Sequence, residues 1–176
     1  MKNSIYSIFI FAIVLTSSVQ LTAQEFKILD KSPMDMASFP SSYKISNKIA
    51  KVIYSRPQLK GRDLFDLAPP NKVWRTGANE AAEITFYKDI VFGDKPLKAG
   101  TYSLFTIPSK DGDWTIIINS ARNVWGSYYY KKDQDVIRVP GKVSKSVENI
   151  EAFSMIFDKD MTCLLYTSDA ADDVRG

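Results

Sequence analysis

The sequence contains no histidine, and its only cysteine is Cys163. A lone cysteine cannot form a disulfide within the chain, so an intrachain disulfide framework is excluded. Without histidine, the usual Ser–His–Asp triads and Cys–His dyads of hydrolases are excluded within these 176 residues. Zinc sites normally use histidine and cysteine ligands, so we also expect no metal.

The chain also lacks the glycine-rich and basic patterns that bind phosphates. Its 8 glycines are scattered and form neither a G-x-G-x-x-G run nor a phosphate-binding loop. The formal net charge is only +3, and no long run of lysine and arginine occurs. We therefore expect no cofactor and no nucleic-acid partner, and the oligomeric state stays open. With 45% hydrophobic and 24% charged residues, the composition is typical of one globular domain.

The N-terminus has the features of a secretory signal peptide in the usual order. Lys2 precedes an apolar run over residues 5–15, and small and polar residues follow up to Ala23. A membrane anchor is the alternative, but the run is shorter than the roughly 20 residues that span a bilayer. We predict a signal peptide over residues 1–23, a periplasmic or extracellular protein, and no membrane association after cleavage. Residues 24–40 are expected to form a linker or an N-terminal arm.

The C-terminus has an unusual sequence. Residues 163–173 read CLLYTSDAADD, which resembles the conceptual translation of a common transposon-type sequencing adapter. We therefore predict that residues 163–176 are a non-native tail, and such a tail takes no part in fold reasoning. On this interpretation the natural C-terminus is missing. The alternative is a genuine polar tail.

Short strand patterns dominate residues 41–162, the predicted domain. EITFYKDIVF (83–92) alternates apolar and polar residues, which predicts a half-buried antiparallel strand. TYSLFTIP (101–108) is apolar on both faces and predicts a central core strand, and the intervening residues 93–100 predict a turn. Similar strand patterns are KVIYS, DWTIIIN, VWGSYYY, DVIRVPGKVSK and IEAFSMIFD. The absence of a sustained helical period predicts an all-β fold, an antiparallel β-sandwich or jelly-roll-like single domain truncated at its C-terminus.

Two polar segments at the expected strand ends carry candidate binding residues. YSRPQLKGRDLF follows a strand and VWRTGANEA precedes one, and the loops of β-sandwiches commonly hold binding sites. Arginine offers a planar fork of donors to carboxylates, sulfates or phosphates, and asparagine and glutamate can read hydroxyl groups. Tryptophan and tyrosine, including those of WGSYYY, can stack on sugar rings. The candidate ligand-binding residues are Arg56, Lys60, Arg62, Trp74, Arg75, Asn79, Glu80, Trp125 and Tyr128.

The same residues also have a purely structural interpretation. Arg75 and Glu80 would form a partly buried ion pair, and the two tryptophans would belong to the core or to ordinary strands. Arg56 would pair with Asp63 or Asp66. Ion-pair networks at strand ends are common, so the sequence leaves both interpretations open.

Four motifs occur in a specific order: YSRPxxKGR, WRTGANE, AGTYSLFTIP and WGSYxY. Together they resemble a bacterial secreted family catalogued as domain of unknown function 2911. The resemblance covers about residues 45–157 and implies an exported β-domain, but the family name implies no activity. Family members continue further, which implies that this chain is truncated. Members tend to have a Val-Pro-Tyr-Gly-like turn before the tryptophan motif. This chain reads APPN over 68–71 instead and lacks the tyrosine of that turn, so the resemblance assigns no role to it here.

Two main functions fit these residues. The one we favour is a non-catalytic binding module for a small anionic or sugar-like ligand, in which the arginines hold the ligand. The alternative is a glycan hydrolase, which needs a carboxylate pair such as Glu80 with Asp63 or Asp66, one of them a general acid. A third interpretation is a structural or protein-interaction domain, in which these side chains fill their own pocket.

Overall fold

The fold is described from a computed structural model, which describes residues 26–146 and 150–158. The predicted signal peptide over 1–23 and the predicted tail over 163–176 lie outside the described residues. Within the described part, no helix is long and apolar enough to span a bilayer.

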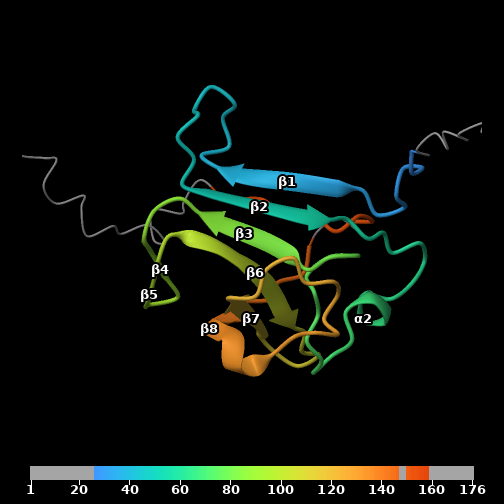
Figure 1. The fold of residues 1–176 in the computed structure, drawn as a ribbon. Helices are drawn as coiled ribbons and strands as arrows, with labels where there is room; N and C mark the ends of the chain where they lie inside the picture. Colours follow the sequence, from blue (N-terminus) through green and yellow to red (C-terminus); the bar gives the residue numbers. More distant parts are fainter. Residues whose placement is uncertain (1–25, 147–149, 159–176) are drawn as a thin grey trace, which may run out of the picture.

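The described residues form a 6-stranded antiparallel sheet with the order β1-β2-β3-β6-β7-β8 and a 2-stranded sheet, β4-β5 (Figure 1). The strands are β1 (Met34–Phe39), β2 (Ala50–Ser55), β3 (Ala82–Phe86), β4 (Ile90–Phe92), β5 (Lys95–Leu97), β6 (Gly100–Ile107), β7 (Trp114–Asn119) and β8 (Asp135–Gly141). The helical segments of the described chain are short: α2 (Leu64–Leu67) and a 3-10 turn, η1 (Lys132–Gln134). The predicted all-β class is confirmed.

One face of the large sheet forms the main core. Val52 of β2 lies opposite Ile84 of β3, and alternate residues along both strands are buried on this face. The β4-β5 hairpin covers the face with Ile90 and Leu97. The segment 150–158 also packs against this core, through Phe153, Met155 and Phe157. Period-two patterning therefore produces one apolar face, as the sequence predicts for a half-buried sheet.

In the described chain, the opposite face carries a second, smaller core over β6 and β7. Phe105 and Ile117 are fully buried there, beneath Ala81 and Val124 from two loops. The neighbouring residue Leu104 points to the main core, so β6 contributes side chains to both cores. The prediction of a central core strand over 101–108 is confirmed, because β6 pairs with β3 on one side and β7 on the other.

The prediction of one continuous strand over 83–92 is wrong. β3 ends at Phe86, the chain bends at Tyr87 and Lys88, and β4 belongs to the small sheet. The alternation continues across the bend because Ile90 packs into the same core as Phe86. Hydrophobic period alone therefore does not reveal the break.

The predicted turn over 93–100 is wrong in part. Gly93 and Asp94 form the turn of the hairpin, and both have positive φ values, 54° and 65°. Two consecutive residues with positive φ are typical of the tight turns that join antiparallel strands. The next residues, Lys95–Leu97, form β5 rather than more turn.

The segment 24–40, predicted as a linker or an N-terminal arm, contains a strand, since β1 within it pairs antiparallel with β2. Two further strand predictions are corrected. The predicted strands in VWGSYYY and IEAFSMIFD are absent from the described chain, where these segments make only the isolated bridges Glu80–Trp125 and Gln58–Ala152. Both segments cover the sheet as irregular chain, which accounts for their apolar residues.

Candidate functional site

The WRTGANE and WGSY segments lie together at one end of the large sheet. Glu80 and Trp125 form an antiparallel bridge, and the Gly126 amide donates to the Asn79 carbonyl at 2.9 Å. The Ala81 amide donates to the Val124 carbonyl at 2.8 Å. Two of the motifs singled out from the sequence therefore form one surface.

Local backbone geometry explains why the WRTGANE loop folds as it does. Thr76 and Asn79 have φ values of 54° and 58°, and the chain bends over residues 76–79. Gly77 packs against strand β2, where an added Cβ would lie 2.9 Å from the Ser55 carbonyl oxygen. The Thr76 hydroxyl donates to the Thr106 hydroxyl at 3.2 Å, which ties the loop to β6. The WRTGANE loop is thus packed against strands β2 and β6 of the sheet.

Arg75 lies at the centre of this surface. Its Nε donates to the Gly77 carbonyl at 3.3 Å. A Cβ on Gly126 would lie 3.4 Å from Arg75 Nη1 and 2.8 Å from the ring of Tyr128, so both side chains lie over this glycine. The predicted ion pair between Arg75 and Glu80 is wrong, because neither residue belongs to a salt bridge within the described chain and Glu80 is exposed.

The aromatic residues of the surface are open to solvent. Trp125 is 53% exposed and Tyr128 is 79% exposed. Asp30 accepts a hydrogen bond from the Ser32 amide and another from the Asn79 side chain, and these two bonds, in that order, lower the pKa of Asp30. The Asn79 side chain is therefore partly engaged by Asp30. We refer to Arg75, Asn79, Glu80, Trp125 and Tyr128 as the arginine–aromatic surface.

Arg56 does not belong to this surface. Its Nε donates to the Phe153 carbonyl at 2.9 Å, its Nη2 to the Ser154 hydroxyl at 2.6 Å, and its Nη1 pairs with Asp35 at 3.1 Å. Arg56 therefore joins the segment 150–158 to strands β1 and β2, and each of its three side-chain nitrogens makes a contact. The predicted pairing of Arg56 with Asp63 or Asp66 is wrong.

The loop after β2 is held together by its own polar groups. Arg62 donates from Nε to the Leu59 carbonyl and from Nη2 to the Gln58 carbonyl, at 2.9 and 2.7 Å. The backbone amide of Lys60 donates to Glu151 at 2.6 Å. Lys60 and Arg62 thus lie in a loop that contacts the segment 150–158, and within the described residues no hydrogen bond or ion pair joins them to the arginine–aromatic surface.

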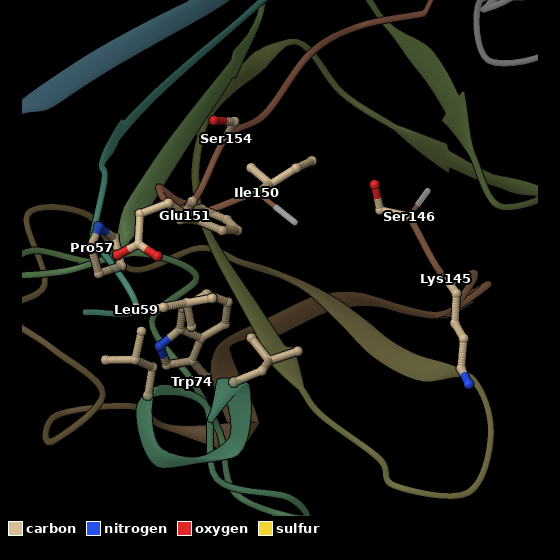
Figure 2. A pocket seen from close by; sticks show the side chains of 11 residues that line it. Pro57, Leu59, Trp74, Lys145, Ser146, Ile150, Glu151 and Ser154 are labelled. Carbon is tan, nitrogen blue, oxygen red and sulfur yellow. The ribbon is translucent and has the colours of Figure 1, made fainter. Parts of the chain in front are cut away.

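Trp74 is 7% exposed and belongs to the interior. Its ring packs edge-on against Phe153 and Trp114, with centroid distances of 5.1 and 6.4 Å. The ring also lines a pocket of about 640 Å³, in which Figure 2 shows Trp74 and Leu59 on one side and Lys145 on the other. The walls are mainly apolar: Pro57, Leu59, Leu64, Leu67, Trp74, Ile150 and Phe153. Trp74 therefore contributes its ring both to the interior and to the apolar wall of this pocket.

A smaller pocket of about 310 Å³ lies beside the arginine–aromatic surface and includes Glu80 and Glu83 in its lining. Glu83 Oε1 accepts a hydrogen bond from the Asn123 amide at 2.6 Å, and Asn123 also lines the pocket. The sequence analysis did not select Glu83 or Asn123. Glu83 occupies an ordinary polar position of an alternating strand, so no sequence signal distinguished it.

A hydrogen-bond network fixes the far end of the loop that carries Trp125 and Tyr128. The Tyr130 hydroxyl donates to Asp135 Oδ2 at 2.6 Å and accepts from Arg138 Nη2 at 2.8 Å. Arg138 Nε also donates to Asp135, at 2.6 Å. Burial, and then the hydrogen bond to Asp135, raises the pKa of Tyr130 above its usual 10.0.

This network predicts a loss of stability in alkali. Because the pKa of Tyr130 is raised on folding, its contribution is complete below about pH 10 and is lost as the pH rises through the folded-state pKa. We expect the difference in unfolding free energy between wild type and Tyr130→Phe to be about 1 kcal/mol near neutrality and to shrink above about pH 10. Urea unfolding of both proteins at several pH values measures this difference. A difference that stays constant through this range would contradict the prediction.

Within the described chain, no group of three or more Asp, Glu, His or Cys side chains could hold a metal ion. A family model described as "Protein of unknown function (DUF2911)" matches residues 32–166, which include all the strands described above and both loops of the arginine–aromatic surface. No curated protein and no solved structure matches the chain. The chain therefore belongs to the DUF2911 family of proteins of unknown function.

Proposed function

We propose that this protein is exported and acts as a non-catalytic binding module for a small anionic or sugar-like ligand. The observation that carries the proposal is the arginine–aromatic surface, in which Arg75 and the ring of Tyr128 lie together over Gly126. A uronic acid, which joins a carboxylate to a sugar ring, matches both features.

The chemistry of the surface supports this ligand class. Arg75 uses Nε for the Gly77 carbonyl, and no hydrogen bond to another described residue is made by its two terminal nitrogens. Two parallel donors of a guanidinium suit a carboxylate. The exposed rings of Trp125 and Tyr128 provide flat apolar faces on which a sugar ring can stack. Glu80, which is exposed beside them, can accept hydrogen bonds from hydroxyl groups.

Binding is better supported than glycan hydrolysis by Glu80 together with Asp63 or Asp66. The carboxylates considered as partners for Glu80 cap helix α2: Asp63 accepts from the Phe65 amide at 2.8 Å, and Asp66 accepts from the Asp63 amide at 3.0 Å. Both groups therefore stabilise a helix N-terminus. A glycosidase needs its two carboxylates on either side of one cleft.

A thermal-shift and calorimetric titration with glucuronate, galacturonate, their neutral parent sugars, sulfate and phosphate tests the proposal. We expect a uronic acid to raise the melting temperature of the wild type, because a ligand that binds only the folded state stabilises it. Arg75→Ala should weaken this binding by about tenfold or more, since hydrogen bonds to charged groups contribute about 1.5–3 kcal/mol. Its stability should fall by only about 1 kcal/mol, because it loses one protein hydrogen bond.

Arg62→Ala is the matched control, because among the described residues Arg62 donates only to carbonyls of its own loop. This variant should bind the ligand as tightly as wild type. Equal binding by wild type and Arg75→Ala would contradict the proposed site. Absence of binding by any of these compounds would contradict the ligand class and favour a protein partner.

A further inference from the structure

A basic pocket lies at the end of the sheet opposite to the arginine–aromatic surface. It has a volume of about 400 Å³ and is lined by Ser46, Asn47, Lys48, Lys51, Tyr87 and Lys88. Three of these residues are lysines, and none is acidic. The ligand surface lies at the start of β3, whereas Tyr87 and Lys88 follow the end of β3, so the two sites lie at opposite ends of this strand.

The fold brings the three lysines together from separate places in the sequence. Lys48 lies in the loop between β1 and β2, Lys51 lies in β2, and Lys88 lies in the bend after β3. The Tyr87 amide donates to the Ile49 carbonyl at 2.9 Å and fixes the bend beside β2. Lys48 Nζ donates to the carbonyls of Pro40 and Ser42 at 2.6 and 2.7 Å, which orders the loop.

The positive charge of this pocket is not neutralised by nearby acids. None of its three lysines takes part in a salt bridge within the described residues. The adjacent carboxylate of Asp89 is bound to Lys98 Nζ at 2.7 Å and to the Ala99 amide at 2.8 Å. Like charges that share a pocket repel one another, and an anion with several oxygen atoms relieves that repulsion.

Exposed apolar side chains lie on the loop that contributes Lys48 to the basic pocket. Tyr43 on this loop is 90% exposed, Ile45 is also exposed, and Tyr87 is exposed in the bend after β3. Lys48 holds the loop that carries Tyr43 and Ile45, and Figure 1 shows this loop projecting beyond the strands. Tyrosine favours the interface between water and lipid, and lysine is attracted to anionic headgroups. Exposed apolar side chains beside the lysines favour a lipid surface, rather than a free anion in solution, as the partner of this pocket.

We propose that this end of the protein docks on an anionic membrane surface, with a headgroup phosphate in the basic pocket and with Tyr43 and Ile45 in the interfacial region. The ligand surface at the opposite end then faces away from the membrane. The sequence predicts no membrane association after signal cleavage. A surface site assembled by folding from Lys48, Lys51 and Lys88 leaves no such signal.

Vesicle co-sedimentation of the chain starting at Gln24, which retains all the described elements, tests this proposal. We expect binding to vesicles containing phosphatidylglycerol and phosphatidylcholine, and little binding to phosphatidylcholine alone. Each lysine near an anionic surface contributes about fivefold in affinity, so the double variant Lys51→Gln/Lys88→Gln should bind about 25-fold more weakly. The double variant Tyr43→Ser/Ile45→Ser should also bind more weakly at the same net charge.

The charge-matched control is Lys72→Gln/Lys142→Gln. Lys72 follows the turn that bonds to Pro108, and Lys142 follows the end of β8, so both lie at the other end of the sheet. The control should bind vesicles as wild type does. If the control bound vesicles as weakly as Lys51→Gln/Lys88→Gln, the loss of binding would depend on net charge alone, and the proposal would be overturned. Binding of inorganic phosphate without any binding to vesicles would overturn it too, because the pocket would then serve a soluble anion.

Discussion

Replacing Trp74 with alanine is expected to lower the free energy of unfolding by about 3–5 kcal/mol, the usual cost of truncating a buried tryptophan. Trp74 is almost completely buried, and its ring packs against Phe153 and Trp114. Its backbone forms two hydrogen bonds with Thr106 of β6, at 2.7 and 3.0 Å, so the surrounding chain is fixed and cannot easily collapse into the cavity. Urea unfolding followed by circular dichroism measures the loss.

Trp125→Ala makes the same chemical change at an exposed site. We expect its stability to stay within about 0.5 kcal/mol of wild type, as is usual for surface substitutions. Under the proposed function Trp125→Ala loses affinity for a uronic acid, whereas Trp74→Ala retains it under conditions where it is folded. Weak binding by Trp74→Ala with unchanged stability would instead make Trp74 a ligand residue. The pair therefore separates the core interpretation of tryptophan from the binding interpretation.

Strands were predictable where the order of buried and exposed residues along the strand reflects which of its faces are covered. Alternation in β2 and β3 reflects one buried face, and β6 is apolar on both faces because each face is covered. β1 was not predicted because it lies at an edge of the sheet and leaves Met34 and Met36 exposed. Its weak pattern resembles that of a loop, since an edge strand needs less apolar surface than a central one.

The sequence singled out the five residues of the arginine–aromatic surface, but the four other candidate residues, Arg56, Lys60, Arg62 and Trp74, lie elsewhere in the fold. The two motifs of the arginine–aromatic surface do lie together, as their polar and aromatic character at strand ends suggested. The partners of Arg56 are different, because Asp35 and Ser154 are far from it in the sequence. Ion pairing depends on which strands are neighbours and on which carboxylates already cap a helix. Local sequence contains neither kind of information.

Replacing Asn119 with aspartate is expected to lower the free energy of unfolding by about 3–5 kcal/mol at neutral pH, as for an unpaired buried charge. Asn119 is completely buried at the end of β7. Its Nδ2 donates to Asp135 Oδ1 at 2.9 Å and to the Lys131 carbonyl at 3.0 Å, while its Oδ1 accepts from the Ala121 amide at 2.9 Å. Aspartate has almost the same shape, but it has no donor when ionised. It would place a negative charge against the carboxylate of Asp135.

The pH dependence of this loss identifies its cause. Burial and the neighbouring carboxylate raise the pKa of the introduced carboxyl group in the folded state above its unfolded value of about 3.9. The ionised form is therefore the destabilised one, and the difference in unfolding free energy between variant and wild type should shrink as the pH falls from neutrality toward about 4.

Asn71→Asp is the matched control, because Asn71 is exposed, and the unfolding free energy of this variant should stay within about 0.5 kcal/mol of wild type. A loss at Asn119 that does not change with pH would indicate missing hydrogen bonds rather than charge. The loop from Ala121 to Lys131 carries Trp125 and Tyr128, and the Asn119 side chain forms a hydrogen bond with each end of this loop. The Asn119→Asp variant should therefore also lose ligand affinity at neutral pH and recover part of it in acid.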